Sequence, residues 1–420
     1  FMLLSGKRRP VAFAGTLLSM MEKRYGDGKT SDSDDPDHEE IRDEERVQDD
    51  GLTPGLRNII AGELIVIDRV TGFGSFEGDD EPLERAAQLL GGRQSEILNP
   101  ADPFTFGLPM LLHSEYMAPG TLDAAVQRCQ YNAYELVSDG FGRGSEKLIR
   151  SEAALLRCQF DDAKRLAMQA DADAAMKDQF FVMASARCVL MRRSLFLGDT
   201  EEAAAQLSDI RRLVPAAVRT IVTERISIAM LREVVVLAEC FFATSLHLKD
   251  DIPPDCLDGS HQCGMVAGLG VPQTYMARAM YVTGDLAGAE RMCDSLVRIS
   301  DVCQCAQLYA LMLSALCRER YYGNGSGMPQ LKRAVVEAQR DGVMLPFAEN
   351  PDVLPLLHKI ERGDDISERF LQDVEAQCEA GRAVIPQHDI SSIPKLSKRE
   401  REVLRLTAIG KSRSEIAELL

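Results

Sequence analysis

Apolar runs long enough to cross a bilayer are lacking. A transmembrane helix needs about 20 predominantly apolar residues, whereas the apolar stretch 234–248 is shorter and contains Glu239. A cleavable secretory signal is not expected, because the basic residues 7–9 and the apolar run 11–21 are followed by the charged residues 22–24 and not by small residues. We therefore expect no membrane contact and a cytoplasmic location.

Positive charge is scarce. The chain has 48 Lys and Arg against 65 Asp and Glu, which gives a formal net charge of −17. A chain this acidic repels phosphate as a whole. Any contact with nucleic acid must therefore come from a segment that is locally basic.

Groupings typical of catalysis or metal binding are also missing. The 6 histidines are dispersed, and none stands near Ser, Cys or carboxylates in a recognisable constellation. Cys256, His261 and Cys263 are close in sequence, as are Cys303 and Cys305. Structural zinc usually takes four ligands in paired spacings, which these residues do not provide. We expect no enzyme activity, no metal site and no cofactor.

The cysteines do not indicate a disulfide framework. Their number, 11, is odd, and they are scattered along the chain. Cys188, Cys240 and Cys317 stand among Leu, Met, Val and Ala. This setting predicts buried free thiols that pack as small apolar groups in a reducing compartment.

Helical periodicity dominates the sequence, and convincing strand alternation is absent. Apolar residues recur at three- and four-residue spacing throughout 52–381, which predicts an all-α sensor or interaction domain. Residues 1–26 are predicted to be a truncated N-terminal helix. Residues 27–51 carry many acidic and few apolar side chains, so we expect a solvated, disordered segment.

An internal repeat is visible within the helical region. The segments 158–163, 198–203 and 284–289 each combine a small residue, a short acidic turn and an alanine: Ala163, Ala203 or Ala289. Their starts are 40 and 86 residues apart, about one and two helix pairs. This spacing predicts a tetratricopeptide-like superhelix with the alanines at helix crossings. The alternative is an irregular helical bundle.

The last residues form a locally basic segment with two helix starts. Residues 395–420 contain 7 Lys or Arg and 4 Glu, a net charge of +3. Ser397 with Glu400, and Ser412 with Glu415, form S-x-x-E capping boxes. Apolar residues of both helices are expected to form a shared core: Leu396, Val403, Leu404, Ala408, Ile416, Ala417 and Leu420. Gly410 ends the first helix, which gives the opening of a helix-turn-helix.

This segment resembles the LuxR-type DNA-binding domain, whose opening runs L-[ST]-x-R-E-x-E-V-L-x-L-x-A-x-G-x-S-x-x-E-I-A-x-x-L. Residues 396–420 follow that pattern, although Arg413 stands where the family often has Asn. Residues 382–394 would be the linker before it. Upstream, 342–357 and 103–109 are similar to segments of the helical arrays in MalT-like regulators.

The resemblance implies a transcription regulator whose helical array senses a ligand or partner and controls the DNA-binding module. It implies promoter DNA as a partner. Further implied partners are a small-molecule or protein effector, RNA polymerase and a second copy of the chain on DNA. Lys411, Ser412 and Arg413, at the start of the second helix, are the expected phosphate contacts. The alternative is a helical-repeat adaptor that binds proteins and never DNA.

The chain is expected to be a fragment that ends before the recognition helix of this module. The recognition helix supplies the base-edge contacts, so promoter binding would require it. Without a third helix, Val403, Leu404, Ile416 and Leu420 would be partly exposed. On this hypothesis the 420-residue chain has no sequence-specific DNA binding.

Overall fold

The computed structural model describes residues 54–71, 81–98, 102–105, 107–220, 225–258, 270–299, 302–360, 365–384, 399, 403 and 413–419. Within these ranges every regular element is a helix and no strand is present, so the prediction of an all-α protein is confirmed. None of the helices found there has the length and apolar character needed to cross a membrane. The segments 1–26 and 27–51, and the linker beyond Val384, lie outside the described residues.

The chain divides into two compact units. The first unit contains α2 (Pro54–Thr71), α3 (Glu81–Leu90) and the 3₁₀ helix η2 (Ala133–Leu136). α2 packs along α3 at Gly62, where a Cβ atom would lie 3.1 Å from both the Ala86 carbonyl oxygen and the Leu90 side chain. The absence of a side chain at Gly62 therefore lets the two helices approach closely.

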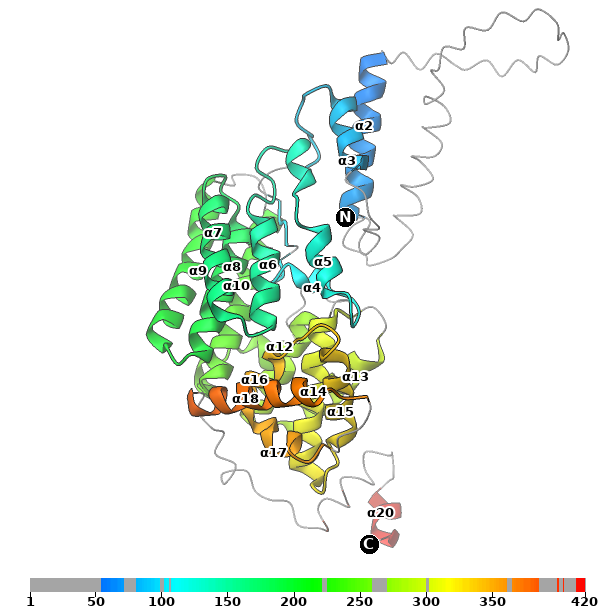
Figure 1. Ribbon diagram of the computed structural model, residues 1–420, viewed down its shortest axis with the longest axis vertical. Coiled ribbons are helices and arrows are strands. Elements are labelled where there is room, and N and C mark those ends of the chain that lie inside the picture. Colours follow the sequence, from blue (N-terminus) through cyan, green and yellow to red (C-terminus); the bar gives the residue numbers. More distant parts are fainter. Residues whose placement is uncertain are drawn as a thin grey trace, which may run out of the picture. The chain divides into compact units, whose positions relative to one another are not determined.

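The second unit begins with helices that are joined by short turns. Its first elements are α4 (Leu112–Glu115), α5 (Leu122–Arg128), α6 (Ser145–Leu156), α7 (Phe160–Ala175), α8 (Phe180–Phe196), α9 (Thr200–Thr220), α10 (Arg225–Ser245), η3 (Lys249–Asp251) and α11 (Asp255–Asp258). Consecutive helices from α6 to α10 pack against one another. Figure 1 shows α7, α8, α9 and α10 side by side in green.

The remaining elements of this unit are also helices. They are α12 (Val271–Thr283), α13 (Leu286–Arg298), α14 (Gln304–Tyr322), α15 (Met328–Ala338), α16 (Leu345–Ala348), η5 (Pro351–Val353), α17 (Leu354–Leu357) and α18 (Glu368–Val384). The last described helix is α20 (Arg413–Leu419).

The three turns that the repeat predicts share one geometry. Cys158, Gly198 and Gly284 each adopt a left-handed backbone, with φ of 58°, 79° and 99°. Each turn ends one helix and allows the next to run back along it. Ala163, Ala203 and Ala289 are fully buried, so their predicted positions in the packed interface are confirmed. The extension of this pattern into a repeat superhelix stays a prediction.

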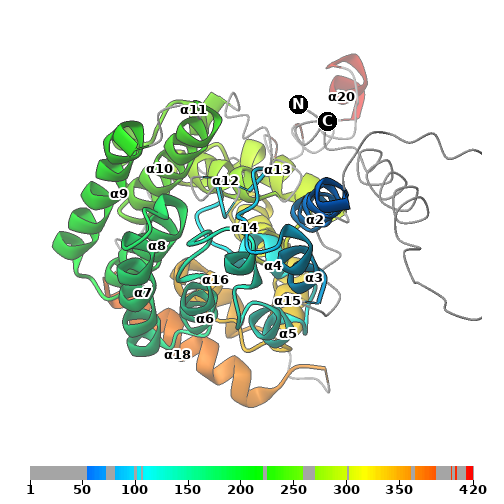
Figure 2. The same cartoon turned by 90° about the horizontal axis from the view of Figure 1, so that it is seen from above.

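The chain returns from α15 to the centre of the second unit. The Met344 backbone N–H donates to the Leu156 carbonyl oxygen at 2.9 Å, which ties the start of α16 to the end of α6. α16 also packs against α14 and α18, and a Cβ atom at Gly381 of α18 would lie 2.4 Å from the Ala348 carbonyl oxygen. Seen from above, α16 lies beside α6 and α14 (Figure 2), both of which it contacts. Residues directly after α16 are thereby placed among buried side chains.

Candidate functional site

An ion pair lies in the interior of the second unit. Arg192 comes from α8, a helix buried on nearly all sides, and Glu349 directly follows α16. The guanidinium Nε donates to Glu349 Oε1 at 3.0 Å, and Nη2 donates to Oε2 at 2.9 Å. The Tyr309 hydroxyl of α14 lies against both groups: it donates to Glu349 Oε2 and accepts from Arg192 Nη2. The pair thus joins three helices that are distant in sequence.

The negative charge of Glu349 determines the protonation state of Arg192. Each side chain is only 4% exposed. Burial alone would lower the pKa of Arg192, but the adjacent carboxylate of Glu349 holds that pKa well above its usual range. The guanidinium therefore stays charged in the interior, and its Nη1 donates to Met110 Sδ at 2.9 Å.

A second buried arginine lies close to this pair. Arg278 of α12 donates to Thr244 Oγ1 at 3.2 Å, to Ser245 Oγ at 3.2 Å and to Asn350 Oδ1 at 3.3 Å. Its guanidinium carbon lies 4.9 Å from the centre of the Phe241 ring, and Arg192 lies 4.8 Å from the same ring. Both arginines therefore make cation–π contacts with one aromatic side chain.

The short helix α4 contributes a histidine beside the pair. His113 is buried, and burial together with the charge of Arg192 lowers its pKa to about 3. The neutral imidazole has one ring nitrogen, Nδ1, without a hydrogen-bond partner among the described residues.

Glu152 of α6 holds the start of α4 in place. Its two carboxylate oxygens accept the backbone N–H groups of Leu111 at 2.9 Å and Leu112 at 2.8 Å. Burial raises the pKa of Glu152 to about 8, although both of these hydrogen bonds lower it. The position of His113 at the cavity therefore depends on a carboxyl group that is itself fully buried.

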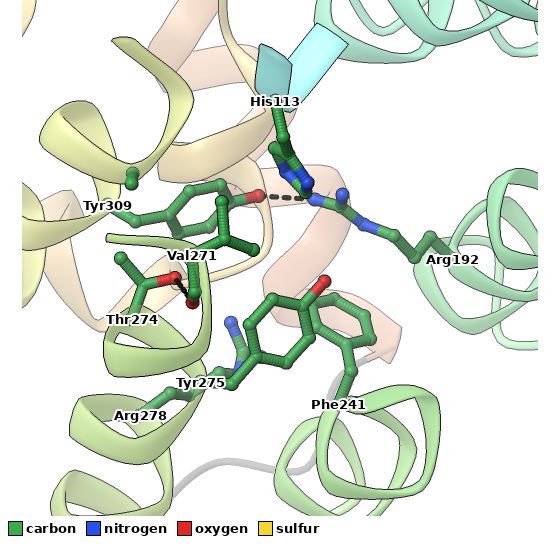
Figure 3. Close-up of a pocket in the computed structure, with 9 residues that line it drawn as sticks. His113, Arg192, Phe241, Val271, Thr274, Tyr275, Arg278 and Tyr309 are labelled. Atoms are coloured by element: carbon green, nitrogen blue, oxygen red, sulfur yellow. Dashed lines mark hydrogen bonds between the residues drawn. The ribbon is translucent and has the colours of Figure 1, made fainter. Parts of the chain in front are cut away.

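These side chains surround a small cavity (Figure 3). Its polar lining consists of His113, Arg192, Thr274, Tyr275, Arg278 and Tyr309, and its apolar lining of Phe241, Val271 and Ala306. The free volume is about 20 Å³, which is space for one or two water molecules. A cavity of this size can hold water or an ion of a few atoms, which its convergent polar groups would orient.

The predicted DNA-binding segment is described only in part. Arg413 and Glu415 are exposed on α20, while Ile416 of the same helix is 8% exposed. Two expected core residues are exposed: Val403 at 37%, and Ala417. The other predicted contact, capping and core residues lie outside the described residues: Leu396, Ser397, Glu400, Leu404, Ala408, Lys411, Ser412 and Leu420. Most members of the predicted core thus lie outside the described residues, and their shared core stays a prediction.

The cysteines are free thiols wherever they are described. Cys188, Cys240 and Cys317 are buried as predicted. Cys303 and Cys305 are also buried, at the start of α14, where the Ala306 backbone N–H donates to Cys303 Sγ at 3.4 Å. This packing makes Cys303 a helix-capping residue, and His261 and Cys263 lie outside the described residues.

The residues of the cavity were not singled out by the sequence patterns. One signal was present: Arg192 and Arg278 stand among apolar residues of largely buried helices, and an arginine on the buried face of a helix requires a polar partner inside the protein. The two segments that are similar to MalT-like arrays contain or adjoin residues of this site. Residues 342–357 contain Glu349, and 103–109 precede Met110 and α4.

Comparisons of this chain with models of protein families, with curated protein sequences and with solved structures found no match in any of the three. The likeness of residues 396–420 to the LuxR-type module is thus carried by those residues themselves.

Proposed function

We propose that the protein is a transcription regulator in which the helical region senses a ligand or partner and controls a C-terminal LuxR-type helix-turn-helix. The observation that carries this proposal is the dense match of residues 396–420 to the opening of that module, with paired capping boxes in a segment of net charge +3. In support, α20 begins at Arg413, immediately after Ser412, the residue that the sequence predicts to cap it. A basic segment on an acidic chain is the arrangement that binding to DNA phosphates requires.

The buried cavity supports the sensor part of the proposal. Its polar groups come from α4, α8, α12 and α14, so a bound molecule would contact helices from distant parts of the chain. A ligand shifts a conformational equilibrium only through contacts that differ between the two states. A site built from several helices provides such contacts when those helices move.

Selection of bound duplexes from a pool of random sequences tests the DNA-binding part of the proposal. The experiment uses the protein as its gene encodes it. We expect one sequence motif to be enriched at about 0.15 M salt. The double variant Lys411→Ala/Arg413→Ala should weaken binding to all sequences alike and reduce the slope of log affinity against log salt by about 1 per residue. The matched control is Arg382→Ala, an exposed arginine on α18, which should leave the slope unchanged.

Failure to enrich any motif would contradict the proposal. So would an unchanged salt slope in the double variant, because phosphate contacts carry the salt dependence. A protein that binds no duplex but copurifies with a defined protein would instead favour the helical-repeat adaptor.

A further inference from the structure

The surroundings of the cavity contain an arginine without a counter-charge. Arg278 is 6% exposed, and no carboxylate of the described residues forms an ion pair with it. Its acceptors are two hydroxyls, an amide oxygen and the Glu349 backbone oxygen, at 3.2 to 3.5 Å. Charge-assisted hydrogen bonds are typically about 2.7–2.9 Å long. A buried charge with only long, neutral contacts is costly, so a counter-ion is expected here.

The neighbouring carboxyl groups do not supply that charge. Glu349 pairs with Arg192. Glu152 accepts two backbone N–H groups, and burial raises its pKa to about 8, so it is largely protonated at neutral pH. His113 is neutral because its pKa is about 3. The buried groups at the cavity therefore sum to two positive charges and one negative charge.

Two further polar groups at the cavity lack partners. His113 Nδ1 is buried and forms no hydrogen bond within the described chain. Tyr275, which is 8% exposed, makes no side-chain hydrogen bond to any residue that the structure describes. Both side chains line the same cavity as Arg278 (Figure 3). An unpaired buried polar atom such as His113 Nδ1 is rare and costly, and the Tyr275 hydroxyl can donate to an anion in the cavity.

We propose that this cavity binds a small monocarboxylate, held by Arg278 and Tyr275 of α12 and by His113 of α4. One negative charge balances the excess of one positive charge, whereas a dianion would leave a buried negative charge. Four of the five guanidinium N–H groups of Arg278 already have acceptors, so the remaining one would donate to a single carboxylate oxygen. The small free volume admits only a carboxylate of about three or four non-hydrogen atoms.

This inference rests on the proposed sensor function and gives it a class of effector. His113, Arg192 and Arg278 belong to α4, α8 and α12, which pack around the same cavity. A carboxylate between them would hold these helices together. Ligand binding would in this way favour one arrangement of the array over another.

Thermal unfolding and calorimetric titration with formate and acetate test the proposal. The buffer is low in chloride, at pH 7 and constant ionic strength. At least one of these carboxylates should raise the melting temperature saturably, by about 2–4 °C. Arg278→Met should abolish the shift, and its melting temperature without ligand should not fall below that of the unchanged protein, because the substitution removes a charge that has no partner.

The control is Arg187→Met, also an arginine on a packed helix. Arg187 donates to Asp171 at 3.0 Å, so this variant should lose stability yet keep the ligand shift. If Arg278→Met does not fold, Tyr275→Phe and Arg278→Lys provide the test, and each should weaken carboxylate binding about tenfold.

Three results would overturn the assignment. The first is the absence of a shift with every carboxylate, and the second is unchanged binding in the Tyr275 and Arg278 variants. The third is a larger shift with phosphate or chloride than with any carboxylate. The duplex selection tests the C-terminal module independently, so failure of one proposal is distinguishable from failure of the other.

Discussion

Burial sets the protonation of two side chains near the Arg192–Glu349 pair, in opposite directions. Desolvation disfavours the charged form of any group. It therefore raises the pKa of Glu152 from 4.5 to about 8 and lowers that of His113 from 6.5 to about 3. Both groups are neutral near pH 7, which leaves the two arginines and Glu349 as the charges at the cavity.

Glu152 should make the protein less stable as the pH rises from about 6.5 to 8. Its raised pKa, about 8, means that the folded state binds a proton that the unfolded state, with a pKa of 4.5, has already released. The free energy of unfolding therefore falls with pH, by up to about 1.4 kcal/mol per pH unit. Urea unfolding at pH 6.5, 7.2 and 8 measures this slope.

Glu152→Gln should flatten the slope, because the amide does not titrate. Glu379→Gln, an exposed position on α18, serves as the control and should keep it. A slope that is identical in all three proteins would show that Glu152 is ionised throughout this range.

His113 should oppose Glu152 below pH 6.5. Its folded-state pKa is about 3 and its ordinary value is 6.5. Between these values the unfolded chain binds a proton that the folded protein excludes, so stability falls as the pH falls. His113→Asn should therefore reduce the loss of stability between pH 6.5 and 4.5, measured by urea unfolding. Unfolding curves that respond equally to pH in both proteins would contradict a buried neutral histidine.

At the scale of the elements, several turns between helices share one backbone conformation. A left-handed residue ends one helix, and an alanine early in the next lies fully buried at the contact. Asp178 and His247, with φ of 51° and 55°, adopt the left-handed backbone after α7 and α10 although neither is a glycine. The sequence pattern missed these two turns because it required a small residue at the left-handed position and an alanine five residues later, whereas the backbone conformation is also open to Asp and His.

Ala203→Leu should destabilise the packing of α8 against α9. Ala203 is fully buried, so a larger side chain must displace its neighbours. Overpacking of this kind costs roughly 1–3 kcal/mol. The melting temperature measures the effect, and Ala205→Leu at an exposed position of α9 is the matched control. An unchanged melting temperature for Ala203→Leu would show that the helices adjust freely.

At the scale of the whole second unit, a buried ion pair joins segments that are 157 residues apart. Arg192 and Glu349 connect α8 with the end of α16, and Tyr309 adds α14. Removing one partner of such a pair leaves an uncompensated buried charge, whereas replacing both is often tolerated. The stability of variants of this pair therefore measures how strongly the pair holds the segment after α16 in the core.

Glu349→Gln should cost about 3–5 kcal/mol of unfolding free energy. The double variant Arg192→Met/Glu349→Gln should recover part of that loss, because it removes the isolated charge as well. The exposed pair of Arg165 and Asp162, 2.7 Å apart, is the control, and Arg165→Ala should change stability by less than about 1 kcal/mol. Urea unfolding of the unchanged protein, of the single variants Arg192→Met and Glu349→Gln and of the double variant gives the coupling energy, and a value near zero would contradict the central role of the pair.

The sequence by itself determined the helical class, the three repeated turns and the burial of their alanines. These features depend on periodicity and on residues close together in the chain. Gly ends a helix, Asp caps the next one, and Ala allows the two helices to pack closely. The sequence also holds the LuxR-like pattern of residues 396–420, for which α20 is the described part. The core predicted for that segment stays a prediction, since Val403 and Ala417 are exposed.

Only the tertiary structure decided which charges meet. Arg192, Arg278, Glu349 and His113 lie on four elements, and no spacing in the sequence relates them. A buried arginine looks the same in sequence whether its partner is a carboxylate, as for Arg192, or a set of neutral oxygens, as for Arg278. The partner is chosen by helix packing over distances of many tens of residues, which local patterns do not encode.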